Sequence, residues 1–184
     1  MISRYTHGEL IWIDLESPTQ GEVRDIMNEF DIAPSVAEEL LLPSVRPKVD
    51  YHDSHLYLVL HFPALRHSHK LSQEQEVDFI IGQKFIITTH YDTVDPLHKF
   101  SKVFEVDSIL DRHNMGEHAG FIFYYMIKKL YRSIEHEIEV VRDRLEDAEA
   151  RIFEGQEKDM VRNLSFISRD LLNMRQALSP HRET

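Results

Sequence analysis

The chain has 184 residues, of which 42% are hydrophobic and 29% charged, so it can bury the core of one domain of ordinary size. Lys and Arg total 21 against 32 for Asp and Glu, and the formal net charge of −11 excludes the general attraction to phosphates on which nucleic-acid binding depends. The absence of cysteine excludes disulfides and thiolate metal sites, and leaves carboxylate, imidazole and carbonyl ligands available for cations.

Neither a secretion signal nor a membrane span is expected in this sequence. The first seven residues lack the apolar run of a signal peptide, so we expect the chain to begin in the cytosol. The densest apolar run, Phe121 to Ile127, is interrupted by Lys128 and Lys129 and is far shorter than the ~18 to 20 residues that cross a bilayer.

The first half of the sequence predicts a sheet with helices packed on it. Residues 9–15 alternate with apolar side chains on both faces, which is typical of a strand buried on both sides between helices. A cap at Ser17-Pro18-Thr19 starts a helix that ends near Phe30, and a short helix with Pro34 in its first turn carries Glu38 and Glu39.

Further strands are predicted after the Arg46-Pro47-Lys48 turn. Alternation at residues 49–51 and 56–61, around Asp53-Ser54, predicts a hairpin. Residues 66–75 are expected to form a loop, and residues 76–81 and 84–90 a second strand pair. The sheet is therefore expected to have about five strands, built mainly from hairpins.

The second half of the sequence is predicted to be helical. A helix is expected from Leu97, with a continuation to Leu110, and two longer apolar stripes at three- and four-residue spacing are separated by Gly155. Such stripes predict a long antiparallel helical hairpin that ends at Ser179-Pro180. The fold class expected is α/β, with a mixed, largely antiparallel sheet between helical layers; residues 1–116 form the sheet portion and 117–184 the hairpin of one compact unit.

An ordered set of short motifs resembles the N-terminal cytoplasmic domain of CorA-like divalent metal transporters. The set comprises Trp12-Ile13-Asp14-Leu15, the pattern F-x-I-x-P-x-V-x-E-[DE]-x-L-x(4)-R-P-K that begins at Phe30, Glu76-Val77-Asp78-Phe79-Ile80-Ile81-Gly82, Phe85-Ile86-Ile87-Thr88-Thr89-His90, and Arg175 with Leu178, Pro180, Arg182 and Glu183. No single piece is diagnostic, but their order covers almost the whole chain.

The resemblance implies a regulatory domain rather than an enzyme. It implies a homopentamer on the cytoplasmic side of the cell membrane, in which a divalent cation, Mg²⁺ or Co²⁺ with Zn²⁺ as a further option, binds between subunits and holds the pore shut. The stalk and membrane helices of that family would follow Thr184, so we expect the chain to be the soluble part of a longer protein, joined to the membrane only through them. The metal carried, and the direction of transport, are left open.

The resemblance also implies that Glu38 and Glu39 are the ligands of the regulatory ion. Adjacent carboxylates supply the oxygen donors that hard cations prefer, with water in the remaining positions. Lys128 stands where some relatives carry an acidic ligand and would repel a cation there. On their own, without the resemblance, the two glutamates are more typical of a solvated helix surface than of a metal site.

Other candidate sites have plainer interpretations. His67 and His69 are spaced for a shared transition metal on a strand, but a solvent-exposed loop is preferred, and His113, His118 and His136 lack a zinc-hydrolase spacing. Glu76 and Asp78, two apart on a strand, could act as an acid/base pair, but a solvent face or salt bridges to helix lysines is preferred. With no nucleotide-binding or nucleophile motif, no catalytic residue is predicted. The alternative function is a freestanding interaction module that uses the helical hairpin without sensing metal.

Overall fold

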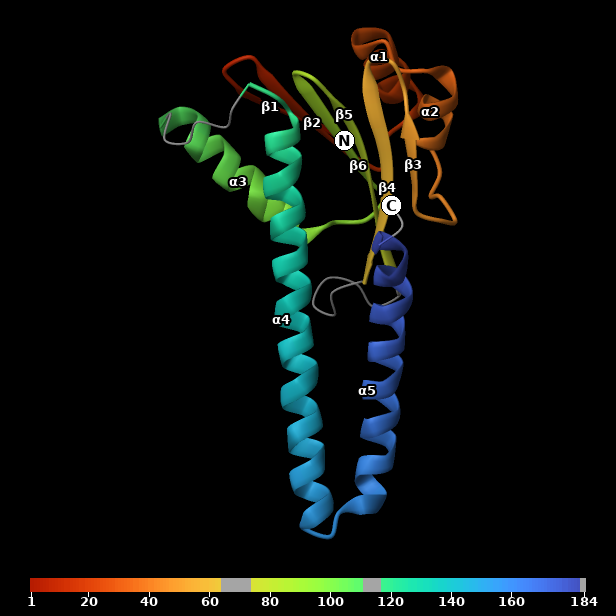
Figure 1. Ribbon diagram of the computed structural model, residues 1–184, viewed down its shortest axis with the longest axis vertical. Helices are drawn as coiled ribbons and strands as arrows, with labels where there is room; N and C mark the ends of the chain where they lie inside the picture. The colour runs from red at the N-terminus through yellow and green to blue at the C-terminus, as the bar shows by residue number, and fades with distance from the viewer. Residues whose placement is uncertain (64–73, 111–116, 183–184) are drawn as a thin grey trace.

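The computed structural model describes residues 1–63, 74–110 and 117–182 (Figure 1). Its strands and helices are, in chain order, β1 (Ile2–His7), β2 (Leu10–Glu16), α1 (Gln20–Phe30), α2 (Pro34–Glu39), β3 (Lys48–Tyr51), β4 (His55–Pro63), β5 (Glu74–Gly82), β6 (Phe85–His90), α3 (Asp95–Leu110), α4 (Gly120–Phe153), α5 (Glu157–Leu178) and the 3₁₀ turn η1 (Ser179–Arg182).

The strands form one six-stranded sheet in the order β1-β2-β6-β5-β4-β3. Only the pairing of β2 with β6 is parallel, so the expected mixed and largely antiparallel sheet is confirmed. The expected count of about five strands omitted β1. This edge strand is half exposed along its length and carries little apolar alternation, because it needs to bury only one face of its side chains.

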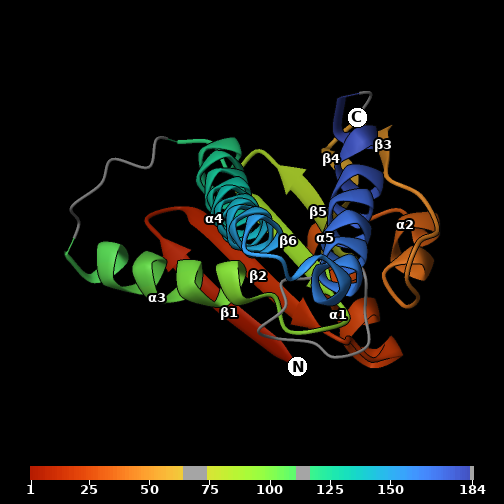
Figure 2. The same cartoon turned by 90° about the horizontal axis from the view of Figure 1, so that it is seen from below.

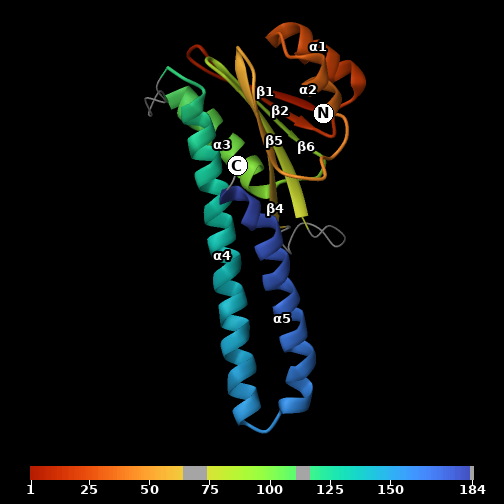
Figure 3. The same cartoon turned by 45° about the vertical axis from the view of Figure 1, so that its right-hand side comes forward.

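Helices cover both faces of the sheet, as Figure 3 shows. On one face α1 and α2 pack on a core that includes Ile13 and Leu15 of β2, and on the other α3 and α4 pack on a core that includes Leu10 and Trp12. The expectation that β2 is buried on both sides is confirmed.

The helical hairpin extends well beyond the sheet (Figure 1), and Figure 2 shows α4 and α5 nearly end-on. The first turns of α4 pack on the sheet through Ile122 and Met126, and Gly155, at φ 87°, lies in the turn between α4 and α5. The predicted stripe of α4 is only partly covered by α5, because Ile138 and Leu145 remain exposed. The boundary proposed between residues 116 and 117 stays a prediction, since residues 111–116 lie outside the described ranges.

The end of α5 returns to the sheet at β4. The His181 Nε2–H donates to the carbonyl oxygen of His61 at 2.8 Å, and the Tyr131 hydroxyl lies 2.7 Å from His181 Nδ1. Burial lowers the pKa of His181, which favours the neutral imidazole that this pair of hydrogen bonds requires.

Replacing Thr19 with alanine should destabilise the protein by about 1 kcal/mol. The Thr19 hydroxyl accepts the Glu22 amide proton at 3.3 Å, and the Glu22 carboxylate accepts the Thr19 amide proton at 2.8 Å, which together form a capping box at the start of α1. Urea unfolding followed by circular dichroism measures the change. Ser35→Ala, at an exposed position of α2, is the control, and an equal loss in both variants would contradict a capping role for Thr19.

Candidate functional site

The predicted ligands Glu38 and Glu39 lie at the end of α2 in different environments. Val36 and Ala37 bury the inner side of this helix against the sheet, which leaves Glu38 exposed and Glu39 half-buried. Pro34 in the first turn fixes the helix start. Glu38 is therefore open to solvent or to another molecule.

Glu39 is held by a cation of its own chain. The Lys48 ammonium forms a salt bridge with the Glu39 carboxylate and a second one, of 2.8 Å, with Asp50. Burial acts to lower the pKa of Lys48, but its bonds to Asp50 and Glu39 outweigh burial and raise it, so Lys48 stays charged. A divalent cation bound by Glu39 would have to compete with Lys48.

Lys128 lies far from this pair within one chain. It is exposed on α4, 5.8 Å from the centre of the Tyr124 ring, and α4 covers the face of the sheet opposite to α2 (Figure 3). Residues of α2 and the exposed side of α4 could therefore contribute to one ion only if they came from two different chains.

Glu76 and Asp78 do not lie on a solvent face, and neither pairs with a lysine of a helix in the described part of the chain, so both preferred interpretations are wrong. Both carboxyl groups point to the side of β5 that α1 and α2 cover, and only 1% of Asp78 is exposed. The cause is tertiary: α1 and α2 cover this face of the sheet, and the chain between α2 and β3 contacts Glu76 through Ser44.

Glu76 fastens that connection to the sheet. Its carboxylate accepts the Ser44 amide proton at 2.8 and 2.9 Å, and its Oε2 lies 3.3 Å from Nε2 of His61, its neighbour across β4 and β5. The hydrogen bond to Glu76 raises the pKa of His61. Ser44 and His61 were missed by the sequence analysis, although a carboxylate in an otherwise apolar strand was the signal that could have located them.

Asp78 lies deeper in the same face. The Tyr57 hydroxyl donates to its Oδ2 at 3.4 Å. Among the described residues, its Oδ1 has no hydrogen-bond partner. Burial, together with the neighbouring Glu76, raises the pKa of Asp78 to about 9. Asp78 is therefore a neutral acid at pH 7.

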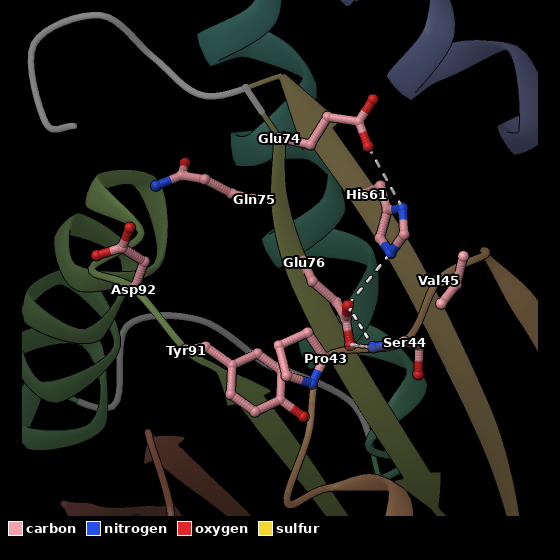
Figure 4. Close-up of a pocket in the computed structure, with 9 residues that line it drawn as sticks. All are labelled: Pro43, Ser44, Val45, His61, Glu74, Gln75, Glu76, Tyr91 and Asp92. Carbon is pink, nitrogen blue, oxygen red and sulfur yellow. Dashed lines mark hydrogen bonds and ion pairs between the residues drawn. The ribbon is translucent and has the colours of Figure 1, made fainter. Parts of the chain in front are cut away.

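A cavity of about 360 Å³ opens beside Glu76, between the α2–β3 connection and the sheet (Figure 4). In the close-up, His61 lies between Glu74 and Glu76, with its Nδ1 3.7 Å from Glu74. The residues lining the cavity are Pro43, Ser44, Val45, His61, Glu74, Gln75, Glu76, Tyr91 and Asp92. Three of the nine lining residues, Glu74, Glu76 and Asp92, are acidic, and His61 forms ion pairs with Glu74 and Glu76.

The other histidine candidates do not form a site in the described ranges. His67, His69 and His113 lie outside the described residues. His118 accepts the Gly120 amide proton at 2.9 Å at the start of α4, and His136 is exposed on that helix. Within residues 1–63, 74–110 and 117–182, no group of three or more His, Asp and Glu residues is arranged to hold a metal ion.

Comparison with known proteins places the chain among metal transporters. It is 26% identical over 178 residues to the cobalt/magnesium transport protein CorA of Thermotoga maritima, covering 94% of this chain and 48% of that protein. The chain therefore spans about half the length of this curated relative. Among the described helices, none is long and apolar enough to cross a membrane.

Solved structures share the fold. The soluble domain of CorA from Methanocaldococcus jannaschii superimposes with a TM-score of 0.77 at 17% identity, over 95% of this chain and 68% of that one. The ZntB cytoplasmic domain from Vibrio parahaemolyticus gives 0.71 at 12% identity, over 93% of this chain and 65% of the other. Residues 7–184 match the family model described as CorA-like Mg2+ transporter protein, so the chain belongs to the CorA-like family of metal ion transporters.

Proposed function

We propose that this chain is the cytoplasmic metal-sensing domain of a CorA-like divalent-cation transporter, and that a cation bound between copies of it holds the pore shut. Membership of the family supports the transporter role. The full protein would be a homopentamer, joined to the membrane by helices that follow this part of the sequence. Mg²⁺ or Co²⁺ is the regulatory ion proposed, with Zn²⁺ as a further option.

The observation that carries this proposal is the position of Glu38 and Glu39. Glu38 is exposed at the end of α2, with Glu39 beside it. Carboxylates of this kind bind Mg²⁺ through one or two direct oxygens, with waters completing the octahedron, so a few ligands from each of two chains suffice.

Regulation then follows from linkage. An ion that binds the closed arrangement of copies more tightly than the open one stabilises the closed state by its differential affinity. When the cytoplasmic concentration of the ion falls, this stabilisation is lost and the copies can separate.

Calorimetric titration with Mg²⁺, Co²⁺ and Zn²⁺, with particle size followed by light scattering, tests the proposal. We expect metal uptake accompanied by association, and loss of both in Glu38→Ala/Glu39→Ala. Glu149→Ala/Glu154→Ala removes the same charge from exposed positions at the far end of α4 and should behave as wild type. Absence of uptake at millimolar metal, or equal uptake by both double variants, would refute these residues as the site.

Replacing Lys48 with glutamine should tighten divalent-cation binding by up to about five-fold. The change removes the ammonium that occupies Glu39, and an ion pair of this partly exposed kind contributes about 0.2–1 kcal/mol. The same titration measures the change in Kd, with Lys129→Gln on the exposed side of α4 as the control for net charge. Unchanged or weaker affinity in Lys48→Gln alone would show that Glu39 is not a ligand.

The second candidate is an interaction module that uses the helical hairpin. Large apolar side chains are exposed on both helices, among them Leu145 on α4 and Val161 and Leu172 on α5. Self-association that is independent of metal and abolished by Leu172→Glu, but not by Glu38→Ala/Glu39→Ala, would favour this function over metal sensing.

A further inference from the structure

Two carboxyl groups lie on the covered face of β5 with too little positive charge to balance them. Glu76 and Asp78 are two residues apart on that face. Only 1% of Asp78 and 7% of the Glu76 side chain are exposed to solvent. His61 bonds to Glu76 at 3.3 Å, but Asp78 forms no ion pair in the part of the chain that the structure describes. A buried carboxylate without a counter-charge is strongly unfavourable, so one of the two must carry a proton.

Among the residues that the structure describes, the other groups around Asp78 do not supply that counter-charge. They are Tyr57 and His61 from β4, Thr89 from β6 with Tyr91 just after it, Lys48 from β3 and Glu39 from α2. Lys48 is engaged by Glu39 and Asp50, and His61 by Glu76 and Glu74. A proton on Asp78 removes its charge and allows its carboxyl group to donate a hydrogen bond to the neighbouring Glu76.

Glu76 is also the attachment point of the chain between α2 and β3. Both of its oxygens receive the Ser44 amide proton, at 2.8 and 2.9 Å. A second contact at this end of α2 is the Tyr91 hydroxyl, which donates to the Glu39 carbonyl oxygen at 3.2 Å. Glu76 therefore belongs both to the buried carboxyl pair and to the contact that holds the α2–β3 connection on the sheet.

We propose that Glu76 and Asp78 form a proton-controlled latch. While Asp78 keeps its proton, Glu76 holds the Ser44 amide and the α2–β3 connection stays docked on the sheet; when Asp78 loses that proton, the connection is released.

Release follows because the second negative charge must be solvated. Two carboxylates on neighbouring positions of one face repel each other strongly where water is excluded. The cavity beside Glu76 does not include Asp78 in its lining, and Pro43, Ser44 and Val45 form one of its walls, so movement of that wall would bring more water to the carboxyl pair (Figure 4). Burial raises the pKa of Asp78 to about 9, so the latch is closed at neutral pH and opens under alkaline conditions.

The latch rests on the fold alone and does not depend on metal binding. Its consequence is nevertheless of interest for regulation, because α2 carries Glu38 and Glu39 and would lose one of the contacts at its C-terminal end when Ser44 is released. Glu76 and Asp78 act here as positioning residues.

Carbon-detected NMR of the metal-free protein between pH 6 and 10.5 tests the latch directly. We expect the carboxyl carbon of Asp78 to titrate with a midpoint near pH 9, and the Cα signal of Ser44 to change with the same midpoint. In Asp78→Asn the Ser44 transition should vanish. In Asp53→Asn, the same substitution at an exposed position of the β3–β4 turn, it should persist.

Two results would overturn the proposal: an Asp78 carboxyl that titrates in the ordinary range of aspartate, or a Ser44 signal that does not follow Asp78. Both results can be recognised in the titration of the wild-type protein, so the test does not depend on whether the variants fold well. Because no metal is present, its failure would leave the sensing function untouched, and failure of the metal titration would leave the latch untouched.

Discussion

Asp78→Asn should make the protein more stable at pH 8, by about 1–3 kcal/mol, and should flatten the dependence of its stability on pH. The pKa of Asp78 is raised from 3.8 to about 9 in the folded protein. Between these values the folded state keeps a proton that the unfolded chain has released, so the stability contributed by this group falls as pH rises and levels off above pH 9. One such proton corresponds to a slope of up to about 1.4 kcal/mol per pH unit.

Asparagine has nearly the shape of the protonated acid and needs no proton, so its folded state does not lose stability through this window. Its amide can still donate to Glu76, although less strongly than a carboxylic acid does to a carboxylate. Urea unfolding at pH 5, 7 and 9 measures the slope, with Asp53→Asn as the matched control. A wild-type slope that persists in Asp78→Asn would show that another group holds the proton.

Trp12→Ala should lower the free energy of unfolding by about 3–5 kcal/mol. Trp12 is fully buried in the centre of β2, stacked on Tyr5 at 4.5 Å and in contact with Phe100 and Phe104 at 5.4 and 5.7 Å between ring centres. Its indole N–H donates to the Thr88 hydroxyl at 2.9 Å. Alanine would leave a cavity that the surrounding rings cannot fill, and would remove a hydrogen bond between two strands.

Thermal and urea unfolding followed by circular dichroism measure this loss, because the variant lacks the only tryptophan. Tyr51→Ala, at an aromatic residue that is 86% exposed on β3, should change stability by less than about 0.5 kcal/mol. Trp12→Phe should fall between the two, since it keeps most of the ring contacts and loses the N–H donor. A loss below about 1 kcal/mol in Trp12→Ala would contradict the central role of this cluster.

A further polar network supports the same pair of parallel strands. The Thr88 hydroxyl also bonds to Asp14 at 2.5 Å, and His90 lies 3.3 Å from Asp14. Burial acts to lower the pKa of His90, but the hydrogen bond to Asp14 and its charge outweigh burial and raise it. The motifs around residues 12–15 and 85–90 thus supply side-chain contacts that join β2 and β6.

The helices, strands and turns that depend on short-range sequence patterns could be predicted from the sequence. Apolar residues on both faces of β2, the cap at Thr19, the hairpin turn before β4 and the two helical stripes each report a periodicity that a few neighbouring residues determine. These features were enough to predict the sheet between helical layers and the long hairpin. The order of motifs then indicated the family, and with it Glu38 and Glu39 as candidate ligands.

The environment of those candidates was decided by the tertiary structure. Periodicity says which way a side chain points, but not what covers that face, so Glu76 and Asp78 were assigned to solvent when they lie on the face that α1 and α2 cover. The salt bridge between Lys48 and Glu39, and the bond from Ser44 to Glu76, likewise join residues whose meeting depends on how strands and connections pack. The sequence by itself determined the elements and the family. The register of the sheet and the path of the chain across it decided how deeply each charged group is buried and which partner it contacts. This is so because burial and charge pairing depend on contacts between residues that are distant in the sequence.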